Sequence, residues 1–142
     1  MFSKSCEYAI RSVIIICQNS QQGLKTNVKE ISERAGVPEP YIAKVMQILS
    51  KARVVQSIKG PGGGFYISPD SKDLKLIDVV KAIDGDGLFT SCGLGLKECS
   101  EKNPCPLHDR FKGVRNDIKK MLTETSIHDL SEKLVAFIYS SN

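Results

Sequence analysis

The stretch of sequence that decides the fold spans residues 27–64 and reads NVKEISERAGVPEPYIAKVMQILSKARVVQSIKGPGGG. Asn27, followed three residues later by Glu30, resembles a helix capping box. Gly36 then supplies the tight turn that ends a short helix. The apolar residues of this helix, which share one face, are Val28, Ile31 and Ala35.

A second helix is predicted directly after this turn, over residues 40–51. Pro38 and Pro40 suit a helix entry, because proline is tolerated in the first turn. The side chains expected to point inward are Tyr41, Val45, Ile48 and Leu49. The side chains on other faces include Lys44, Gln47 and Lys51, so the helix is predicted to be amphipathic and basic.

A β-hairpin is predicted to follow. Residues 54–58 are rich in β-branched side chains, residues 60–64 contain four glycines and a proline, and residues 65–67 are again β-prone. This order, helix, turn, helix and hairpin, is that of a winged helix-turn-helix domain. In such a domain the second helix enters the major groove of double-stranded DNA, and the hairpin contacts a neighbouring groove.

The topology also predicts which residues contact DNA. On the second helix these are Glu39, Pro40, Ala43, Lys44 and Gln47. On the hairpin, Lys59 is predicted to contact phosphate or the minor groove, and Gly60, Gly62 and Gly63 allow the backbone to approach the duplex. A nucleotide-binding loop is the rival interpretation of the glycines, but no Lys-Ser or Lys-Thr follows them.

Helices are predicted on both sides of this unit. Residues 5–18 and 76–83 each carry a broad apolar stripe, and Ser126 with Asp129 can cap a last helix. The apolar residues of that last helix are Ile127, Leu130, Leu134, Phe137 and Ile138. A narrower apolar seam, typical of helix–helix association, consists of Leu107, Phe111, Val114, Ile118, Met121 and Leu122. We expect this seam to form a homodimer.

The fold class is therefore predicted to be mainly α with a small β-hairpin. The expected parts are a winged helix-turn-helix domain over residues 1–84, a cysteine-rich loop over 85–106, and dimerisation and C-terminal helices over 107–142. The longest apolar stretch is too short to cross a bilayer and the N-terminus does not resemble a signal peptide, so we expect a soluble cytoplasmic protein without membrane contact. The net charge of +4 is compatible with a polyanionic partner but does not demonstrate one.

Five cysteines divide into two groups. Cys6 and Cys17 lie in an apolar helix and are expected to be buried. The candidate metal site combines Cys92, Cys99, Cys105 and His108, which could hold zinc or an iron–sulfur cluster. A metal-free thiol sensor, in which two of the three late cysteines form a disulfide, is also open. A cysteine-dependent enzyme is not expected, because no nucleophile elbow or oxyanion glycine accompanies the cysteines.

Four features of the sequence occur together: the run YAIR at residues 8–11, the helix that starts PYI at 40–42, the wing KGPGGGF at 59–65 and the three late cysteines. In this combination the chain resembles the Rrf2 family of bacterial repressors. The resemblance implies a homodimeric winged-helix repressor whose subunit interface is a long helix near residues 107–122. IscR-like members have Glu-Gln after the tyrosine of the recognition helix, whereas this chain has Ala43 and Lys44. The operator sequence therefore cannot be transferred.

The resemblance also implies an iron–sulfur cluster bound by the three late cysteines, which would sense iron–sulfur, redox or nitric oxide status. IscR-like members complete a [2Fe–2S] site with a histidine three residues after the last cysteine, which corresponds to His108 here. NsrR-like members cap a [4Fe–4S] cluster with an N-terminal acidic residue from the other subunit, which corresponds to Glu7. We prefer His108 and [2Fe–2S], because His108 is local to the cysteines, and keep Glu7 with [4Fe–4S] as the alternative.

Overall fold

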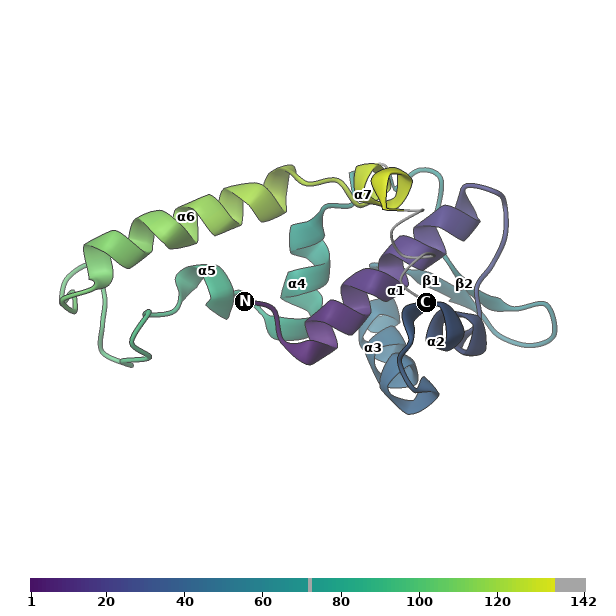
Figure 1. The fold of residues 1–142 in the computed structure, drawn as a ribbon, viewed down its shortest axis with the longest axis horizontal. Coiled ribbons are helices and arrows are strands. Elements are labelled where there is room, and N and C mark those ends of the chain that lie inside the picture. Colours follow the sequence, from purple (N-terminus) through teal and green to yellow (C-terminus); the bar gives the residue numbers. More distant parts are fainter. Residues whose placement is uncertain (72, 135–142) are drawn as a thin grey trace.

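The computed structural model describes residues 1–71 and 73–134, and this part of the chain is mainly helical with one two-stranded hairpin (Figure 1). The predicted fold class is therefore confirmed. The elements, in chain order, are α1 (Lys4–Ser20), α2 (Val28–Ala35), α3 (Glu39–Lys51), β1 (Gln56–Ile58), β2 (Gly64–Tyr66), α4 (Leu76–Asp84), α5 (Gly87–Thr90), α6 (His108–Glu124) and α7 (Ile127–Lys133).

Helix α2 begins and ends as its sequence predicts. The Asn27 side chain accepts a hydrogen bond from the Glu30 backbone N–H at 2.8 Å. Gly36 adopts the left-handed conformation, with φ of 70°, in which a side chain would be strained. The Glu30 carboxylate accepts from the Asn19 amide, so it ties α2 to the end of α1. These contacts orient the turn that precedes α3.

Helix α3 shows that the predicted inward face was partly wrong. The buried residues are Ile42, Val45, Met46 and Leu49. Tyr41 is 58% exposed, and its ring lies 6.2 Å from the ring of Tyr8, whereas Ile48 is only half-buried. The prediction started the stripe one residue too early, because the aromatic Tyr41 was assigned to the core. The stripe actually begins at Ile42.

The hairpin forms in the predicted place but is shorter. Its antiparallel register pairs Gln56 with Tyr66, and Ile58 with Gly64. Val54 and Val55, predicted as strand, are instead buried residues that lead into β1. The Thr26 and Phe65 backbones exchange two hydrogen bonds of 2.9 and 2.8 Å, which attach the hairpin to the segment before α2.

Helix α1 forms the centre of the core. It packs against α2, α3, α4 and α7, and Cys6 and Cys17 are buried in it as predicted. At its start, Ser3 Oγ donates a hydrogen bond of 2.6 Å to Asp84 at the end of α4. This contact places the N-terminus of α1 beside the segment that leads into the cysteine loop.

Helix α6 extends away from this core, and α7 packs against α1. α6 projects away from the hairpin and carries the cysteine loop at its far end (Figure 1). Its other end is anchored where Leu76 N–H donates to the Thr125 carbonyl and Ile127 N–H donates to the Leu74 carbonyl. Ser126 caps α7 by accepting from the Asp129 N–H, as predicted. The predicted apolar residues Phe137 and Ile138 lie outside the described residues.

Within residues 1–71 and 73–134, none of the helices combines the length and apolar character needed to span a bilayer.

Candidate functional site

The three late cysteines meet in the loop between α5 and α6. The sulfur atoms of Cys92, Cys99 and Cys105 all lie within 4.8 Å of one another, and those of Cys92 and Cys105 are 3.6 Å apart. All three residues are half-buried. The loop thus gathers the three thiols into one group although they span fourteen positions of the sequence.

Backbone N–H groups point at two of the sulfurs. The Leu94 N–H donates to Cys92 Sγ and the Cys105 N–H donates to Cys99 Sγ, each at 3.4 Å. The backbone N–H groups of Leu96 and Leu94 lower the pKa of the Cys92 thiol to about 7, because such donors stabilise a thiolate. By contrast, burial raises the pKa of Cys6 to about 12. Cys92 is therefore a loop thiol whose surroundings favour the thiolate form that binds metals.

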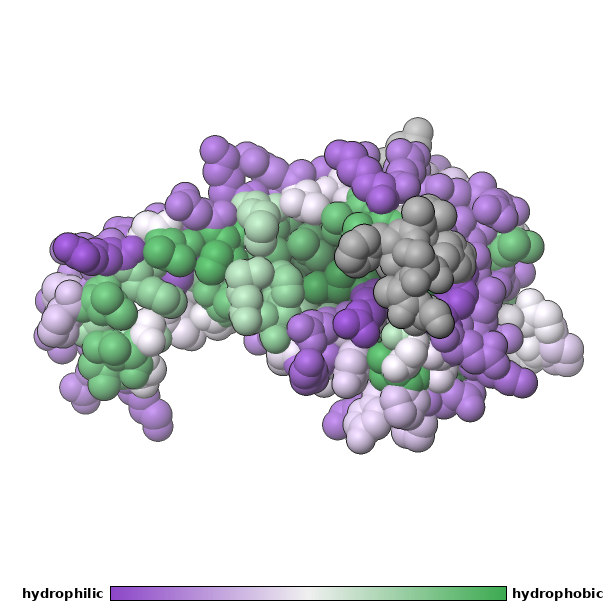
Figure 2. All heavy atoms as spheres, viewed as in Figure 1, coloured by the Kyte–Doolittle hydropathy of each residue, from purple (hydrophilic) through white to green (hydrophobic). Residues whose placement is uncertain are grey.

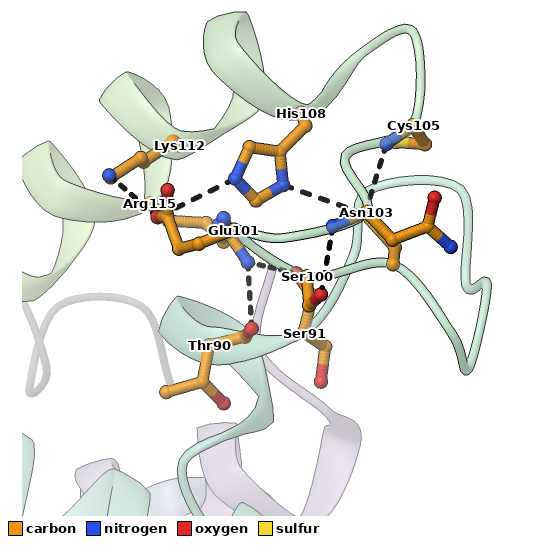
Figure 3. A network of polar contacts seen from close by, with 10 residues as sticks. Thr90, Ser91, Ser100, Glu101, Asn103, Cys105, His108, Lys112 and Arg115 are labelled. Carbon is orange, nitrogen blue, oxygen red and sulfur yellow. Dashed lines mark hydrogen bonds and ion pairs between the residues drawn. The ribbon is translucent and has the colours of Figure 1, made fainter.

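His108 lies beside this group. It is the first residue of α6 and only 7% exposed, and its Nδ1 atom is 3.5 Å from Cys99 Sγ. Figure 3 shows the imidazole between the cysteine loop on one side and Glu101 on the other. Glu7, the alternative ligand, forms an ion pair with Lys4 at 3.3 Å on α1 of the same chain.

The donor set fits an iron–sulfur cluster or a metal ion. Three thiols and one imidazole are the ligands that iron–sulfur clusters and zinc prefer. The N–H donors to sulfur also match the hydrogen bonding that tunes such clusters. Hard cations such as Mg²⁺ and Ca²⁺ do not fit, because they require oxygen ligands.

The cysteine loop is attached to α6 by contacts that were not predicted from the sequence. Arg115 is buried on α6, and its guanidinium donates to the Thr90 and Ser91 carbonyls at 2.7 and 2.8 Å (Figure 3). Gly93 lies against the Phe111 ring, where an added Cβ would come within 2.7 Å of the ring. Helix α5, which was not predicted, supplies the Thr90 carbonyl. Arg115 follows His108 by seven residues, which is about two helical turns, so both lie on the same face of α6. This spacing is the sequence signal that could have indicated a role for Arg115.

The second candidate site is the exposed surface of α3. The predicted DNA-contacting side chains Glu39, Pro40, Ala43, Lys44 and Gln47 are all exposed. Tyr41, which the sequence pattern had assigned to the core, is exposed beside them. The surface thus contains a lysine, a glutamine and a tyrosine that can donate hydrogen bonds to bases or phosphates.

The hairpin turn projects at the end of the molecule opposite the cysteine loop (Figure 1). Lys59 is exposed there, and Gly60 and Gly62 have φ values of +94° and +76°. The Gly63 N–H donates to the Gly60 carbonyl at 2.9 Å, and a Cβ at Gly63 would overlap the Ile58 carbonyl oxygen. Glycine is therefore required for this turn, whether or not it contacts a ligand.

Comparison with known proteins shows that the sequence of this chain is similar to those of transcriptional regulators. The Rrf2 family model, described as an iron-dependent transcriptional regulator, matches residues 2–133. An HTH-type transcriptional regulator of Aquifex aeolicus is 32% identical over 132 residues, which cover 92% of this chain and 90% of that protein. The HTH-type transcriptional regulator IscR of Photorhabdus laumondii is 28% identical over 123 residues, which cover 87% and 74% of the two chains.

Solved structures share the fold. The T. potens IscR structure matches with a TM-score of 0.74 and 22% identity over 94% of this chain and 87% of that one. The structure of CymR, the global cysteine regulator of B. subtilis, matches with a TM-score of 0.73 and 21% identity over 94% and 97% of the two chains. The winged helix-turn-helix arrangement predicted from the sequence is therefore confirmed at the level of the fold.

Proposed function

The chain belongs to the Rrf2 family of DNA-binding transcriptional regulators and is not an enzyme, and from this premise we propose that its affinity for operator DNA is controlled by an iron–sulfur cluster bound in the cysteine loop. The observation that carries the proposal is the convergence of Cys92, Cys99 and Cys105 within 4.8 Å. When bound, the cluster supplies a group that responds to iron supply, oxidants or nitric oxide. We propose further that the protein is a repressor.

His108 is the preferred fourth ligand, which favours a [2Fe–2S] over a [4Fe–4S] cluster. Its imidazole is buried beside Cys99, so little rearrangement is needed to bring it onto a shared metal site. Glu7 of the partner subunit, with a [4Fe–4S] cluster, is the alternative. It would have to leave its ion pair with Lys4, which costs little because both side chains are substantially exposed.

The DNA-binding surface is proposed to combine α3 and the hairpin. Lys44, Gln47 and the exposed Tyr41 would lie in the major groove, together with Glu39, Pro40 and Ala43. Lys59 would contact phosphate or the minor groove, with Gly60, Gly62 and Gly63 shaping the turn that carries it.

A homodimer is proposed because, in the part of the chain that the structure describes, α6 has an exposed apolar face. Val114 and Met121 on this helix are 50% and 43% exposed, and apolar surface continues from α6 towards the cysteine loop (Figure 2). Exposed contiguous apolar surface of this kind is typical of interaction sites. Two copies joined through α6 would present two α3 helices to the two halves of an operator.

The described contacts offer a route from the cluster loop to α3. Arg115 and Phe111 hold the loop against α6. α6 packs against α4, and α4 packs against α3. A loop that changes conformation on gaining or losing its cluster would therefore shift the two α3 helices relative to each other. A differential binding free energy of about 1–3 kcal/mol is enough for a useful switch.

The test is anaerobic purification followed by absorption spectroscopy and assays of iron, acid-labile sulfide and zinc. We expect a coloured protein that contains iron and sulfide in equal amounts. A colourless protein with stoichiometric zinc would contradict the iron–sulfur proposal and would leave a zinc-binding regulator of the same fold.

A cluster-free thiol sensor is the second candidate, favoured by the separation of 3.6 Å between the Cys92 and Cys105 sulfurs. In this function an oxidant takes two electrons and two protons from the two thiols, and a disulfide forms. Peptide mass spectrometry of the oxidised protein, with and without reductant, would detect this bond. Its absence after oxidation would contradict the thiol sensor.

Replacing Lys59 with alanine should weaken DNA binding and reduce its dependence on salt. One lost phosphate contact lowers the slope of log K against log salt by about one. Fluorescence anisotropy with an operator duplex over a salt series measures this slope. Lys102→Ala is the matched control, since it removes the same charge in the cysteine loop, far from the hairpin (Figure 1). An unchanged slope for Lys59→Ala would show that Lys59 contacts no phosphate.

A further inference from the structure

His108 has a different neighbour at each ring nitrogen. Nδ1 lies 3.5 Å from Cys99 Sγ, and Nε2 lies 3.5 Å from Oε1 of Glu101 (Figure 3). The ring is only 7% exposed and belongs to the first residue of α6. The position of His108 at the start of α6 and its burial therefore hold the imidazole in one orientation. In this orientation one ring nitrogen faces the thiols and the other faces a carboxylate.

The Nε2 atom is buried and, among the described residues, lacks a hydrogen-bond partner of good geometry. A buried N–H without a hydrogen-bond partner destabilises the fold. The distance of 3.5 Å to Glu101 exceeds that of a normal N–H···O hydrogen bond. A small movement of the Glu101 carboxylate would close this gap and satisfy the nitrogen.

Glu101 also forms an ion pair with Lys112. Lys112 Nζ lies 2.6 Å from the same Oε1 atom, and this ion pair is the main reason that the pKa of Glu101 is lowered. Lys112 follows His108 by four residues on α6, so the two side chains lie on the same helix face. The carboxylate therefore bridges the first turn of α6, although Glu101 is exposed in the loop.

We propose that Glu101, held by Lys112, is a positioning residue that accepts the Nε2 proton of His108 and so leaves the Nδ1 lone pair facing the three cysteine sulfurs. This inference rests on the proposed function, with His108 as the fourth ligand. A carboxylate that accepts from the distal nitrogen of a metal-binding histidine fixes its tautomer and orientation and raises its basicity. Removing such a partner typically weakens metal binding by about 10–100-fold.

The first measurement uses the metal-free protein and needs no cluster. Long-range ¹H–¹⁵N NMR at a pH where imidazole is neutral reports which ring nitrogen carries the proton. His108 is distinguished from His128, the other histidine of the chain, with a His128→Gln variant. We expect the proton of His108 on Nε2 in the wild type and a mixture of tautomers in Glu101→Ala. Glu101→Gln should restore the Nε2 form, because its amide oxygen can still accept.

The second measurement is the rate at which a chelator removes the reconstituted cluster under anaerobic conditions. Loss from Glu101→Ala should be about tenfold faster than from the wild type, with Glu101→Gln in between because it loses the ion pair to Lys112. Glu98→Ala is the matched control, since it removes the same charge from an exposed position of the same loop. In a His108→Ala background, Glu101→Ala should cause no further acceleration.

Each contrary outcome is distinguishable. A wild-type protein that takes up no cluster contradicts the proposed function. A wild-type tautomer with the proton on Nδ1, or the same tautomer in Glu101→Ala, contradicts this inference alone. Equal chelation rates for Glu101→Ala and Glu98→Ala overturn it as well, as does an effect of Glu101→Ala that persists without His108.

Discussion

Replacing Cys99 with serine is expected to abolish retention of the proposed iron–sulfur cluster. Cys99 Sγ is the sulfur that lies beside His108, and it also accepts the Cys105 N–H. A serine hydroxyl is a poor substitute, because soft thiolates are the preferred ligands of such clusters. The iron and sulfide content after anaerobic reconstitution should fall to background, because loss of a direct ligand weakens metal binding more than the roughly 10–100-fold that loss of an outer-shell partner causes.

Cys17→Ala provides the control for this variant. Cys17 is buried in α1, and burial raises the pKa of its thiol, so it is unsuited to bind iron as a thiolate. This variant should lose some stability through the small cavity it creates but should keep its iron. Full retention of iron by Cys99→Ser, or loss of iron from Cys17→Ala, would place the cluster elsewhere.

Replacing Val114 with aspartate is expected to dissociate the proposed homodimer. Val114 is 50% exposed on α6 and would be buried between two copies of this helix. An unpaired charge in such an interface costs several kcal/mol. Because a monomer loses the advantage of binding two half-sites at once, operator affinity should fall by about 100-fold or more. Analytical ultracentrifugation measures the dissociation, and anisotropy measures the affinity.

Asn116→Asp is the matched control on the same helix. It introduces the same charge at an exposed position that lies roughly opposite Val114 around the helix. This variant should remain dimeric and bind DNA with an affinity close to that of the wild type. If Val114→Asp also stays dimeric, the apolar face of α6 is not the subunit interface.

The elements predicted most accurately were those defined by local interactions. Asn27 and Gly36 define the two ends of α2 through contacts within a few residues. Their effect can therefore be recognised without knowledge of the rest of the chain. The inward face of α3 was harder to predict, since Tyr41 and Ile42 are both apolar neighbours. Only packing against α1 and α4 shows that Ile42 is buried and Tyr41 exposed.

The candidate metal centre was predictable in part for a similar reason. Cys92, Cys99, Cys105 and His108 occur within seventeen positions, so a single loop can bring them together. The environment of His108 was not predictable, because Glu101 and Lys112 look like ordinary charged surface residues in the sequence. Arg115 likewise resembles a solvated helix position until the loop carbonyls are seen to accept from it.

The sequence by itself thus determined the helix-turn-helix and hairpin order, the ends of α2 and the identity of the clustered thiols, because short-range hydrogen bonds, backbone conformation and spacing control these features. The tertiary structure alone decided which face of α3 is exposed, which residues of α6 contact the cysteine loop and which carboxylate faces His108. Those features depend on contacts between segments that fold together from separate parts of the chain. Burial and distance, which create them, are not encoded in any one local pattern.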